Sequence, residues 1–334
     1  APTTKTGYST DVGVLESLRP HPLAEAMLRY RSISKLKSTY LDALPKEIDP
    51  ESGHIHASFH QIGAATGRLS SQHPNLQNIP MRSAEGARIR EAFVPSGKDS
   101  VLLSADYSQI ELRVLAHLSE EASLTEAFES GQDIHTATAA RVFGLAYGAV
   151  GREERARAKA VNFGLIYGMG PKLLAVNTGM SFEEAKDFIR QYFESFPGLR
   201  DYLKGLVELA REKGYTMTMA GRRRDLPDLR SENGRLRSAA ENMALNTPIQ
   251  GSAADIIKLA MVRLDRRICE HKLPLALLLQ VHDELVFECP RSRAAEMAAT
   301  VSEVMQDRQM FGENFKVPLL VEVKIGDNWL EAHG

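Results

Sequence analysis

The sequence predicts an α+β fold in which a sheet that carries acidic residues is interrupted by a long, mostly helical insertion. One observation is the apolar run 101–103, which leads into a strand that ends at Asp106. Another is segment 275–289, which is typical of a hairpin and has Asp283 at its turn. The third is the block of helix formers between them, residues 109–250. If the two carboxylates meet, which the sequence alone does not show, they form an oxygen site of the kind that Mg²⁺ prefers.

The other elements follow from the spacing of apolar residues. Residues 14–43 repeat apolar side chains at helical spacing with a break at Pro20–Pro22, so two helices and a connector are expected. Residues 53–93 should form short strands, with loops at Pro74 and Pro80. The remaining expected elements are amphipathic helices near 182–196 and 198–213, a helix from 253 to about 271, a helix over 291–307 and a closing strand over 317–325.

Composition and charge are those of an ordinary globular protein. The net charge of -2 argues against a uniformly basic coat, although basic clusters at 152–159 and 222–224 could bind phosphates or remain solvated surface. Cys269 and Cys289 form no CxxC pair, and neither a signal peptide nor a long apolar run is visible. A reducing, intracellular compartment is therefore expected, and the start at Ala1 indicates a processed or truncated product.

One predicted helix places cations and aromatic rings on a single face. Arg155, Lys159, Phe163 and Tyr167 follow one another at a spacing of four residues. Cations suit a polyphosphate and flat rings suit a sugar or base, so the face could hold a nucleotide. Aromatic stripes are more often part of the core, and the pattern alone leaves both interpretations open.

Six blocks of sequence, in order, resemble the DNA polymerase I family, family A. Three look like its motifs A, B and C, namely Asp106–Arg113, Arg155–Gly168 and Val281–Leu285. The other matches are Thr66–Ser71 with Pro74–Pro80, Asp133–Thr136 and Thr247–Asp255. The resemblance covers essentially the whole chain.

The resemblance implies a right-hand polymerase fold, with an antiparallel palm sheet, inserted helical fingers and a partial thumb. It implies a distal thumb at 1–50, a first palm segment at 51–115, fingers at 116–240 and a second palm segment with the catalytic hairpin at 241–334. The nuclease and proofreading domains of the family have no counterpart in these residues. No exonuclease activity is therefore expected of this chain.

By similarity, Asp106 and Asp283 bind two Mg²⁺ ions, which Mn²⁺ can replace, and Tyr107 adds its backbone carbonyl. Glu284 is expected to be a secondary metal-site residue, because strand alternation points it away from Asp283. Lys159 is the third expected catalytic residue.

The nucleotide site is also implied by similarity. Glu111 resembles the steric gate that leaves no room for a 2′-hydroxyl, Phe163 would pack on the sugar and base, and Tyr167 would stack at the templating position. The expected triphosphate contacts are Gln109, His135, Arg155 and Lys159.

The expected DNA contacts divide by the part of the duplex that they would touch. Primer-side minor-groove contacts are implied for Arg68, Gln250 and His282, further duplex contacts for Asn75, Gln77, Asn78 and Asn246, and phosphate contacts for Lys37 and Arg222. Asn242 and Asp225 depart from the family pattern, in which Arg and an aromatic residue are common, and this leaves the details of template contact open.

The resemblance implies a template-directed DNA polymerase that adds dNMP to a primer 3′-hydroxyl and releases pyrophosphate, in replication and in gap filling during repair. The expected partners are primer-template DNA and a dNTP, with no membrane and a monomeric state. The expected location is cytoplasmic, at a bacterial-type nucleoid, with a phage or organelle origin left open.

Three alternatives differ from this function in residues or in products. A single-subunit RNA polymerase would not place Glu at position 111 in this way. A catalytically silent DNA-binding scaffold would be expected to lack Asp106, Asp283 or Lys159. A two-metal nuclease would shorten a primer instead of extending it.

Overall fold

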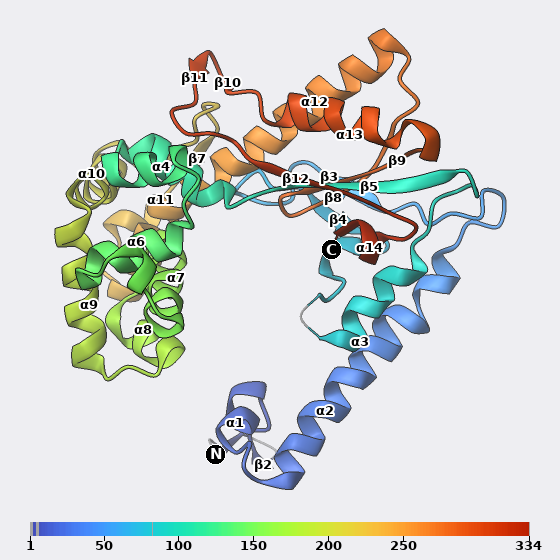
Figure 1. Ribbon diagram of the computed structural model, residues 1–334. Coiled ribbons are helices and arrows are strands. Elements are labelled where there is room, and N and C mark those ends of the chain that lie inside the picture. The colour runs from blue at the N-terminus through green and yellow to red at the C-terminus, as the bar shows by residue number, and fades with distance from the viewer. Residues whose placement is uncertain (1–2, 5–6, 82, 334) are drawn as a thin grey trace.

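The computed structural model describes residues 3–4, 7–81 and 83–333, and it has the predicted α+β architecture. A four-stranded antiparallel sheet has the strand order β12-β5-β9-β8 (Figure 1). Its strands are β12 (Val321–Gly326), β5 (Ser100–Tyr107), β9 (Glu284–Pro290) and β8 (Ala276–Val281). Both predicted acidic segments therefore belong to neighbouring strands of one sheet.

The side chains of β5 alternate between two apolar cores, because successive residues of a strand point to opposite faces. Leu103 and Tyr107 belong to the larger core, whereas Leu102 belongs to the smaller one. By the same alternation, Asp106 lies on the face of Leu102. The smaller core also contains the fully buried Trp329.

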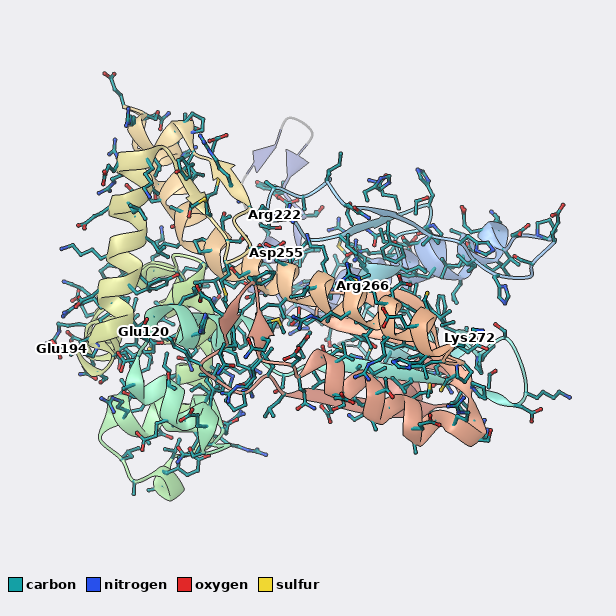
Figure 2. All side chains as sticks on the ribbon, turned by 90° about the horizontal axis from the view of Figure 1, so that it is seen from above. Glu120, Glu194, Arg222, Asp255, Arg266 and Lys272 are labelled. Atoms are coloured by element: carbon teal, nitrogen blue, oxygen red, sulfur yellow. The ribbon has the colours of Figure 1, made fainter. Side chains whose placement is uncertain are left out.

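Helices cover both faces of the sheet (Figure 1). The larger core is closed by α12 (Ser252–His271) and α13 (Ala294–Met305), and the smaller core by the short carboxy-terminal helix α14 (Trp329–His333). Seen from above, α12 crosses the molecule from Asp255 towards Lys272 (Figure 2). This helix therefore links the helical part of the chain to the sheet.

The insertion between β5 and α12 is mostly helical, as predicted. Its helices are α4 (Ile110–Ser119), α5 (Ala122–Glu129), α6 (Ile134–Phe143), α7 (Arg152–Ile166), α8 (Pro171–Thr178), α9 (Phe182–Ser195), α10 (Pro197–Lys213) and α11 (Gly234–Asn246). A reciprocal capping box between Ser181 and Glu184 fixes the start of α9. Phe128 and Leu199 of the insertion join the larger core, so the insertion and the sheet share one apolar interior.

The sequence did not predict the hairpin formed by β6 (Tyr215–Met217) and β7 (Arg223–Asp225) within the insertion. Strand β7 carries only charged residues and thus lacks the apolar alternation that marks a half-buried strand. Arg223 instead covers the ring of Tyr215 at 4.0 Å. The closing strand β12 also begins later than predicted, because Val317 and Leu319 are buried in the larger core without belonging to a strand.

The amino-terminal part extends away from the sheet (Figure 1). It contains α1 (Val12–Ser17) and α2 (Pro22–Leu36), the two helices that the proline break predicted. Three short strand pairs lie elsewhere in the chain, namely β1 (Thr3–Thr4) with β2 (Gly7–Tyr8), β3 (Ser58–His60) with β4 (Ser70–Gln72), and β10 (Gln309–Met310) with β11 (Glu313–Asn314). The short helix α3 covers Ala84–Ala87, and π-helical turns cover Lys37–Leu41 and Thr247–Gly251. The 3-10 turns are Leu44–Glu47, Leu76–Asn78, Arg88–Ala92, Tyr147–Ala149, Pro227–Arg230 and Arg291–Arg293.

Candidate active site

Asp106 and Asp283 line the same cavity, which has a volume of about 460 Å³. The cavity lies between the end of the sheet and the helical insertion. Its other predicted site residues are Arg68, Tyr107, Gln109, Glu111, Phe163 and Tyr167. The structure therefore brings together the two acids and most of the residues predicted to contact a nucleotide.

The backbone of two adjacent strands produces this convergence. Asp106 is paired with Glu284 in the β5–β9 register, and the Tyr107 N–H donates a hydrogen bond to the Asp283 carbonyl at 3.1 Å. Asp283 occupies the turn between β8 and β9, where His282 has a φ of 54°. Such left-handed geometry is uncommon outside glycine, and here it belongs to the turn that presents Asp283 to the cavity.

Burial and neighbouring carboxylates disfavour negative charge on both acids. Burial raises the pKa of Asp106 to about 7, and the carboxylates of Asp283 and Glu284 act in the same direction. Burial also raises the pKa of Asp283, and Glu111 adds to that effect. A divalent cation held by these carboxylates would oppose both pKa shifts, because a nearby positive charge favours the ionised form of an acid.

The donor atoms on this cavity fit Mg²⁺. Two carboxylates and the carbonyl of Tyr107 are hard oxygen ligands, and Mg²⁺ in phosphate-handling sites is held by one or two carboxylates together with water and substrate oxygens. In the described part of the chain, no group of three or more His, Cys, Asp or Glu side chains is placed to hold a metal ion.

The structure does not support Glu284 as a metal ligand. Its buried carboxylate accepts hydrogen bonds from Ser104 Oγ at 2.7 Å and Trp329 Nε1 at 3.0 Å, and it lies 3.5 Å from Arg90. It is also absent from the residues that line the cavity. Glu284 therefore pairs with Asp106 across the sheet but does not face the cavity, and its carboxylate oxygens are already bonded to other side chains.

Glu111 is held rigidly beside the acids. Its side chain is only 8% exposed and accepts hydrogen bonds from Arg68 Nη2 and from the Tyr167 hydroxyl, each at 2.5 Å. Glu111 lies in the first turn of α4, after Gln109, which has a φ of 54°. Three predicted site residues, from three separate segments, thus form one hydrogen-bonded group.

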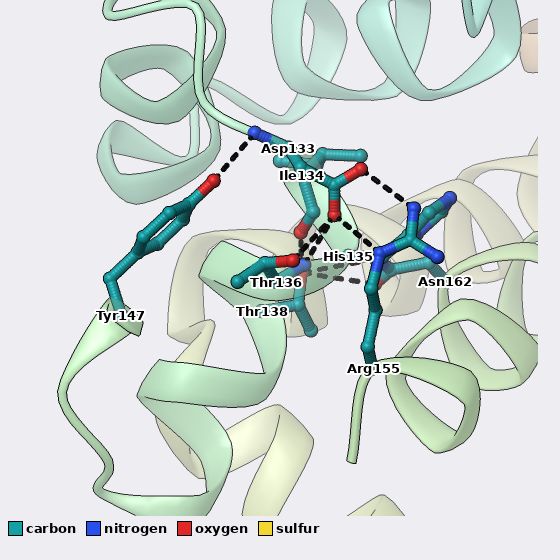
Figure 3. Close-up of polar contacts among 8 residues, drawn as sticks. All are labelled: Asp133, Ile134, His135, Thr136, Thr138, Tyr147, Arg155 and Asn162. Carbon is teal, nitrogen blue, oxygen red and sulfur yellow. Dashed lines mark hydrogen bonds and ion pairs between the residues drawn. The ribbon is translucent and has the colours of Figure 1, made fainter. Parts of the chain in front are cut away.

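The cationic face of α7 is partly as predicted. Arg155 forms a bidentate pair with Asp133, with distances of 3.0 Å from Nε and 2.8 Å from Nη2 (Figure 3). Lys159 is exposed, and within the described residues no hydrogen bond or ion pair of its ammonium is seen. Helix α7 ends at Ile166, so Tyr167 lies in the following turn and does not continue the helical face as the spacing suggested.

His135 differs from its predicted role as a triphosphate contact. The residue is 2% exposed, and its Nδ1 lies 3.2 Å from Asn162 Nδ2 (Figure 3). Its ring centroid lies 5.5 Å from that of Phe163. Burial lowers its pKa to about 4, and the neighbouring cations Arg155 and Lys159 act in the same direction. In this structure His135 is thus a neutral, buried support for α7 rather than a free phosphate ligand.

Sequence reasoning missed the role of Asp133, although a signal was present. Its carboxylate accepts hydrogen bonds from the Thr136 N–H and hydroxyl, both at 2.8 Å, and so caps the start of α6 (Figure 3). An Asp three residues before a Thr at the start of a helical pattern is typical of such a cap. The partner Arg155 could not be found from the sequence, because the two residues are 22 positions apart.

The predicted DNA contacts are placed unequally. Asn75, Asn78 and His282 are exposed, and Gln250 is half-buried next to the Tyr167 hydroxyl. For the buried side-chain oxygen of Asn246, no hydrogen-bond partner is found among the residues that the structure describes. These five residues are compatible with the duplex contacts that were predicted.

Four other predicted DNA contacts are already engaged within the protein, and the first of them, Arg68, bonds Glu111. Gln77 donates to the backbone and side-chain oxygens of Gln280, at 3.1 and 3.0 Å. Arg222 forms a bidentate pair with the buried Asp255, at 3.1 and 2.8 Å. Lys37 bonds Asp42 at 2.6 Å, and the exposure of this pair leaves it weak enough to exchange for a phosphate. The structure thus favours internal roles for Gln77 and Arg222.

The model of DNA polymerase family A matches residues 1–331. The chain belongs to this family. It is 50% identical over 330 residues to DNA polymerase I of Geobacillus stearothermophilus, covering 98% of this chain and 37% of that protein. It is 52% identical over 332 residues to a thermostable DNA polymerase I of Thermus filiformis, covering 99% of this chain and 39% of the relative.

Among solved structures, this family A chain is similar to the POL domain of Pol1 from M. smegmatis in complex with DNA primer-template and dNTP. The TM-score is 0.92 at 47% identity, over 100% of this chain and 58% of the other. This chain spans about two-fifths of the length of the curated relatives named above. The predicted family and fold class are thereby confirmed.

The departures from the family pattern have identifiable surroundings. Asn242 lies against Gly168, at which a Cβ would approach Asn242 Oδ1 to 2.0 Å. Gly168 has a φ of 69°, a backbone conformation that favours glycine. Asp225 bonds Arg223 at 2.8 Å on the exposed strand β7.

No helix in the described ranges is both long and apolar enough to cross a membrane.

Proposed function

We propose that this chain is a template-directed DNA polymerase that adds a deoxynucleotide to a primer 3′-hydroxyl and releases pyrophosphate. The observation that carries the proposal is the convergence of Asp106 and Asp283 on a cavity that Glu111, Phe163 and Tyr167 also line. Acids, a sugar-facing carboxylate and flat rings in one cavity match the parts of a nucleoside triphosphate. The similarity to a polymerase domain in complex with primer-template and dNTP supports the same function.

The chain's own residues would bind and orient the reactants. Asp106, Asp283 and the Tyr107 carbonyl would hold two Mg²⁺ ions, or Mn²⁺ in their place. When bound, these ions lower the pKa of the attacking hydroxyl and neutralise the triphosphate and the leaving pyrophosphate. Lys159, which is exposed and unpaired among the described residues, is free to contact a phosphate. Arg155 reaches a phosphate only by leaving or sharing Asp133.

Selection of the sugar would depend on Glu111. Because Arg68 and Tyr167 hold the Glu111 carboxylate in place, it cannot move aside cheaply for a 2′-hydroxyl. Phe163 would pack on the sugar and base, and the ring of Tyr167 would stack at the templating position. Residues 1–50 would then act as a partial thumb, 51–115 and 241–334 as the palm, and 116–240 as the fingers.

The proposed partners are primer-template DNA and a dNTP, and the proposed state is a monomer in the cytoplasm. Asn75, Asn78, Asn246, Gln250 and His282 would face the duplex. We further propose that this chain has no exonuclease activity. Shortening of a labelled primer in the absence of dNTP would contradict this assignment.

Extension of a labelled primer by the wild-type chain and by Asp283→Asn tests the proposal. With Mg²⁺ and dNTP we expect wild-type extension, and a rate for Asp283→Asn lower by at least about 100-fold, because the lost carboxylate stabilises charge in the transition state. Duplex affinity, measured by fluorescence anisotropy, should change only a few-fold, since the metal site acts mainly on the reacting atoms.

Asp265→Asn is the matched control, because Asp265 is an exposed aspartate on α12 away from the cavity. This variant should extend the primer like the wild type. Failure of the wild type to extend any primer would refute the proposed function. An equal loss of duplex affinity and of rate in Asp283→Asn would refute the role given to Asp283.

A further inference from the structure

Asp255 is a buried charge that the proposed mechanism does not use. It lies in the first turn of α12, is 4% exposed, and accepts hydrogen bonds from Thr218 Oγ1 at 2.7 Å and from the Arg222 guanidinium at 2.8 Å. Lys258 Nζ is 3.3 Å from the same carboxylate. A buried carboxylate costs free energy unless it is paired, so the two cations are required for its burial.

Both cations also lie close to Gly67. Lys258 Nζ donates to the Gly67 carbonyl at 2.7 Å. The Arg222 side chain lies so close that a Cβ at Gly67 would come within 2.4 Å of Arg222 Nε, and Gly67 has a φ of 79°. Figure 2 shows Arg222 and Asp255 at the junction of the helical part and α12. Asp255 thus orders two basic side chains that hold this one loop.

The loop that they hold carries Arg68. Gly67 is the residue before Arg68, and the Arg68 guanidinium bonds Glu111 at 2.5 Å inside the cavity. The loop is also packed from another side, because a Cβ at Gly251 would lie 3.2 Å from the Thr66 carbonyl. A continuous series of contacts therefore runs from Asp255 through Lys258 and Gly67 to Arg68 and Glu111.

We propose that Asp255 is a positioning residue for sugar selection: through Lys258 and Arg222 it fixes the Gly67–Arg68 backbone, and Arg68 then holds Glu111 against the sugar. This proposal rests on the proposed function, since it assigns Glu111 to the nucleotide sugar. It adds a residue outside the cavity to the determinants of the preference for deoxynucleotides over ribonucleotides. A purely structural Asp255 would change stability and overall rate but not this preference.

The first test does not require activity. Amide hydrogen exchange of residues 64–70 is compared in the wild type, Lys258→Met and Asp265→Asn. We expect faster exchange in Lys258→Met, because the Gly67 carbonyl loses its donor, and no change in Asp265→Asn. Unchanged exchange in Lys258→Met would overturn the proposal, because the loop would then not depend on this contact.

The second test measures selectivity as the ratio of kcat/KM for a deoxynucleotide to that for the matching ribonucleotide. Lys258→Met and Asp255→Asn should each lower the ratio by roughly fivefold, the usual size of coupling between contacting residues. If Asp255→Asn does not fold, Lys258→Met carries the test. Asp265→Asn should keep the wild-type ratio.

A double variant decides whether the effect passes through Arg68. Arg68→Ala should lower the ratio, and the Lys258→Met/Arg68→Ala double variant should lower it no further, because the second change acts on a contact that is already lost. The proposal would be overturned if the double variant lowered the ratio by the product of the two single effects, or if Lys258→Met left the ratio unchanged. If the wild type extends no primer, the proposed function fails, and the exchange test still decides whether Lys258 fixes the loop.

Discussion

At the scale of single residues, the Glu111 carboxylate is placed by two donors that approach from different parts of the chain. Arg68 and Tyr167 each bond one of its oxygens, and the side chain is almost fully buried. A carboxylate fixed in this way can exclude a hydroxyl group, whereas a mobile one would turn aside. The position of Glu111 therefore matters as much as its charge.

We expect Glu111→Ala to relax discrimination against ribonucleotides by at least about tenfold, which is the size of effect that loss of a single well-placed contact has on selectivity. Single-nucleotide incorporation with dNTP and NTP gives the two values of kcat/KM. Tyr167→Phe retains the carboxylate and removes one donor, so it should show a smaller change in the same direction. Unchanged selectivity in Glu111→Ala would remove Glu111 from this role.

His135 should make the stability of the protein depend on pH. Burial lowers its pKa to about 4, whereas an unfolded histidine titrates near 6.5. Between these values the unfolded state binds a proton that the folded state does not, so the free energy of unfolding falls as pH falls from about 6.5 towards 4. In the His135→Gln variant, residue 135 takes up no proton on unfolding, so this contribution to the pH dependence is absent.

The difference in unfolding free energy between the wild type and His135→Gln should therefore shrink by about 2 kcal/mol from pH 8 to pH 5. Urea denaturation at the two pH values measures it, and effects of other titrating groups cancel in the difference. A difference that does not vary with pH would show that His135 titrates normally.

At the scale of elements, Asp133 joins two helices by two distinct interactions. It caps α6 through Thr136 and pairs with Arg155 on α7 (Figure 3). The Arg155 hydrogen bond, followed by those from Thr136, holds the pKa of the Asp133 carboxyl well below its ordinary value. Because the folded-state pKa is lowered, the stabilisation is present above about pH 4 and is lost as pH falls further.

Asp133→Ala should therefore lower the free energy of unfolding by about 1–2 kcal/mol at pH 7, the sum of a lost cap and a partly exposed ion pair. Thermal unfolding of the wild type and of Asp133→Ala, measured at pH 7 and at pH 3, should show a smaller destabilisation by the substitution at pH 3. Asp133→Asn retains a capping oxygen, so it should lose less than Asp133→Ala at pH 7. Equal effects of Asp133→Ala at both pH values would contradict the depressed pKa.

The sequence predicted elements well where apolar periodicity or proline marked them, as at α2, α9 and the β8–β9 hairpin. It did not predict β7, because charged residues formed that strand, nor the end of α7 before Tyr167, because residue spacing does not report where a helix stops. Among site residues, local motifs located Asp106 and Asp283. Ion pairs such as Arg222 with Asp255 could not be predicted, because they join residues that are distant in sequence and leave no local pattern.

At the scale of the whole molecule, one apolar core joins the sheet to the helical insertion. Leu103 and Phe287 of the sheet belong to the same buried cluster as Tyr192 and Leu199 of the insertion. The smaller core, on the other face of the sheet, contains the only tryptophan, Trp329, which packs against Phe93 with ring centroids 5.4 Å apart. Relative motion of sheet and insertion is then limited by a shared interior rather than by a separable domain interface.

This shared core predicts that the sheet and the insertion unfold together. Trp329 fluorescence reports on the sheet, whereas far-ultraviolet circular dichroism is dominated by the helices, most of which belong to the insertion. The two signals should give coincident thermal transitions, because loss of either part exposes apolar surface of the other. Leu199→Ala leaves a cavity in the insertion and should lower the free energy of unfolding by about 2–5 kcal/mol. The midpoints of both transitions should fall together. A helical transition that precedes the fluorescence change, or a Leu199→Ala effect confined to circular dichroism, would show that the insertion unfolds as a separate unit.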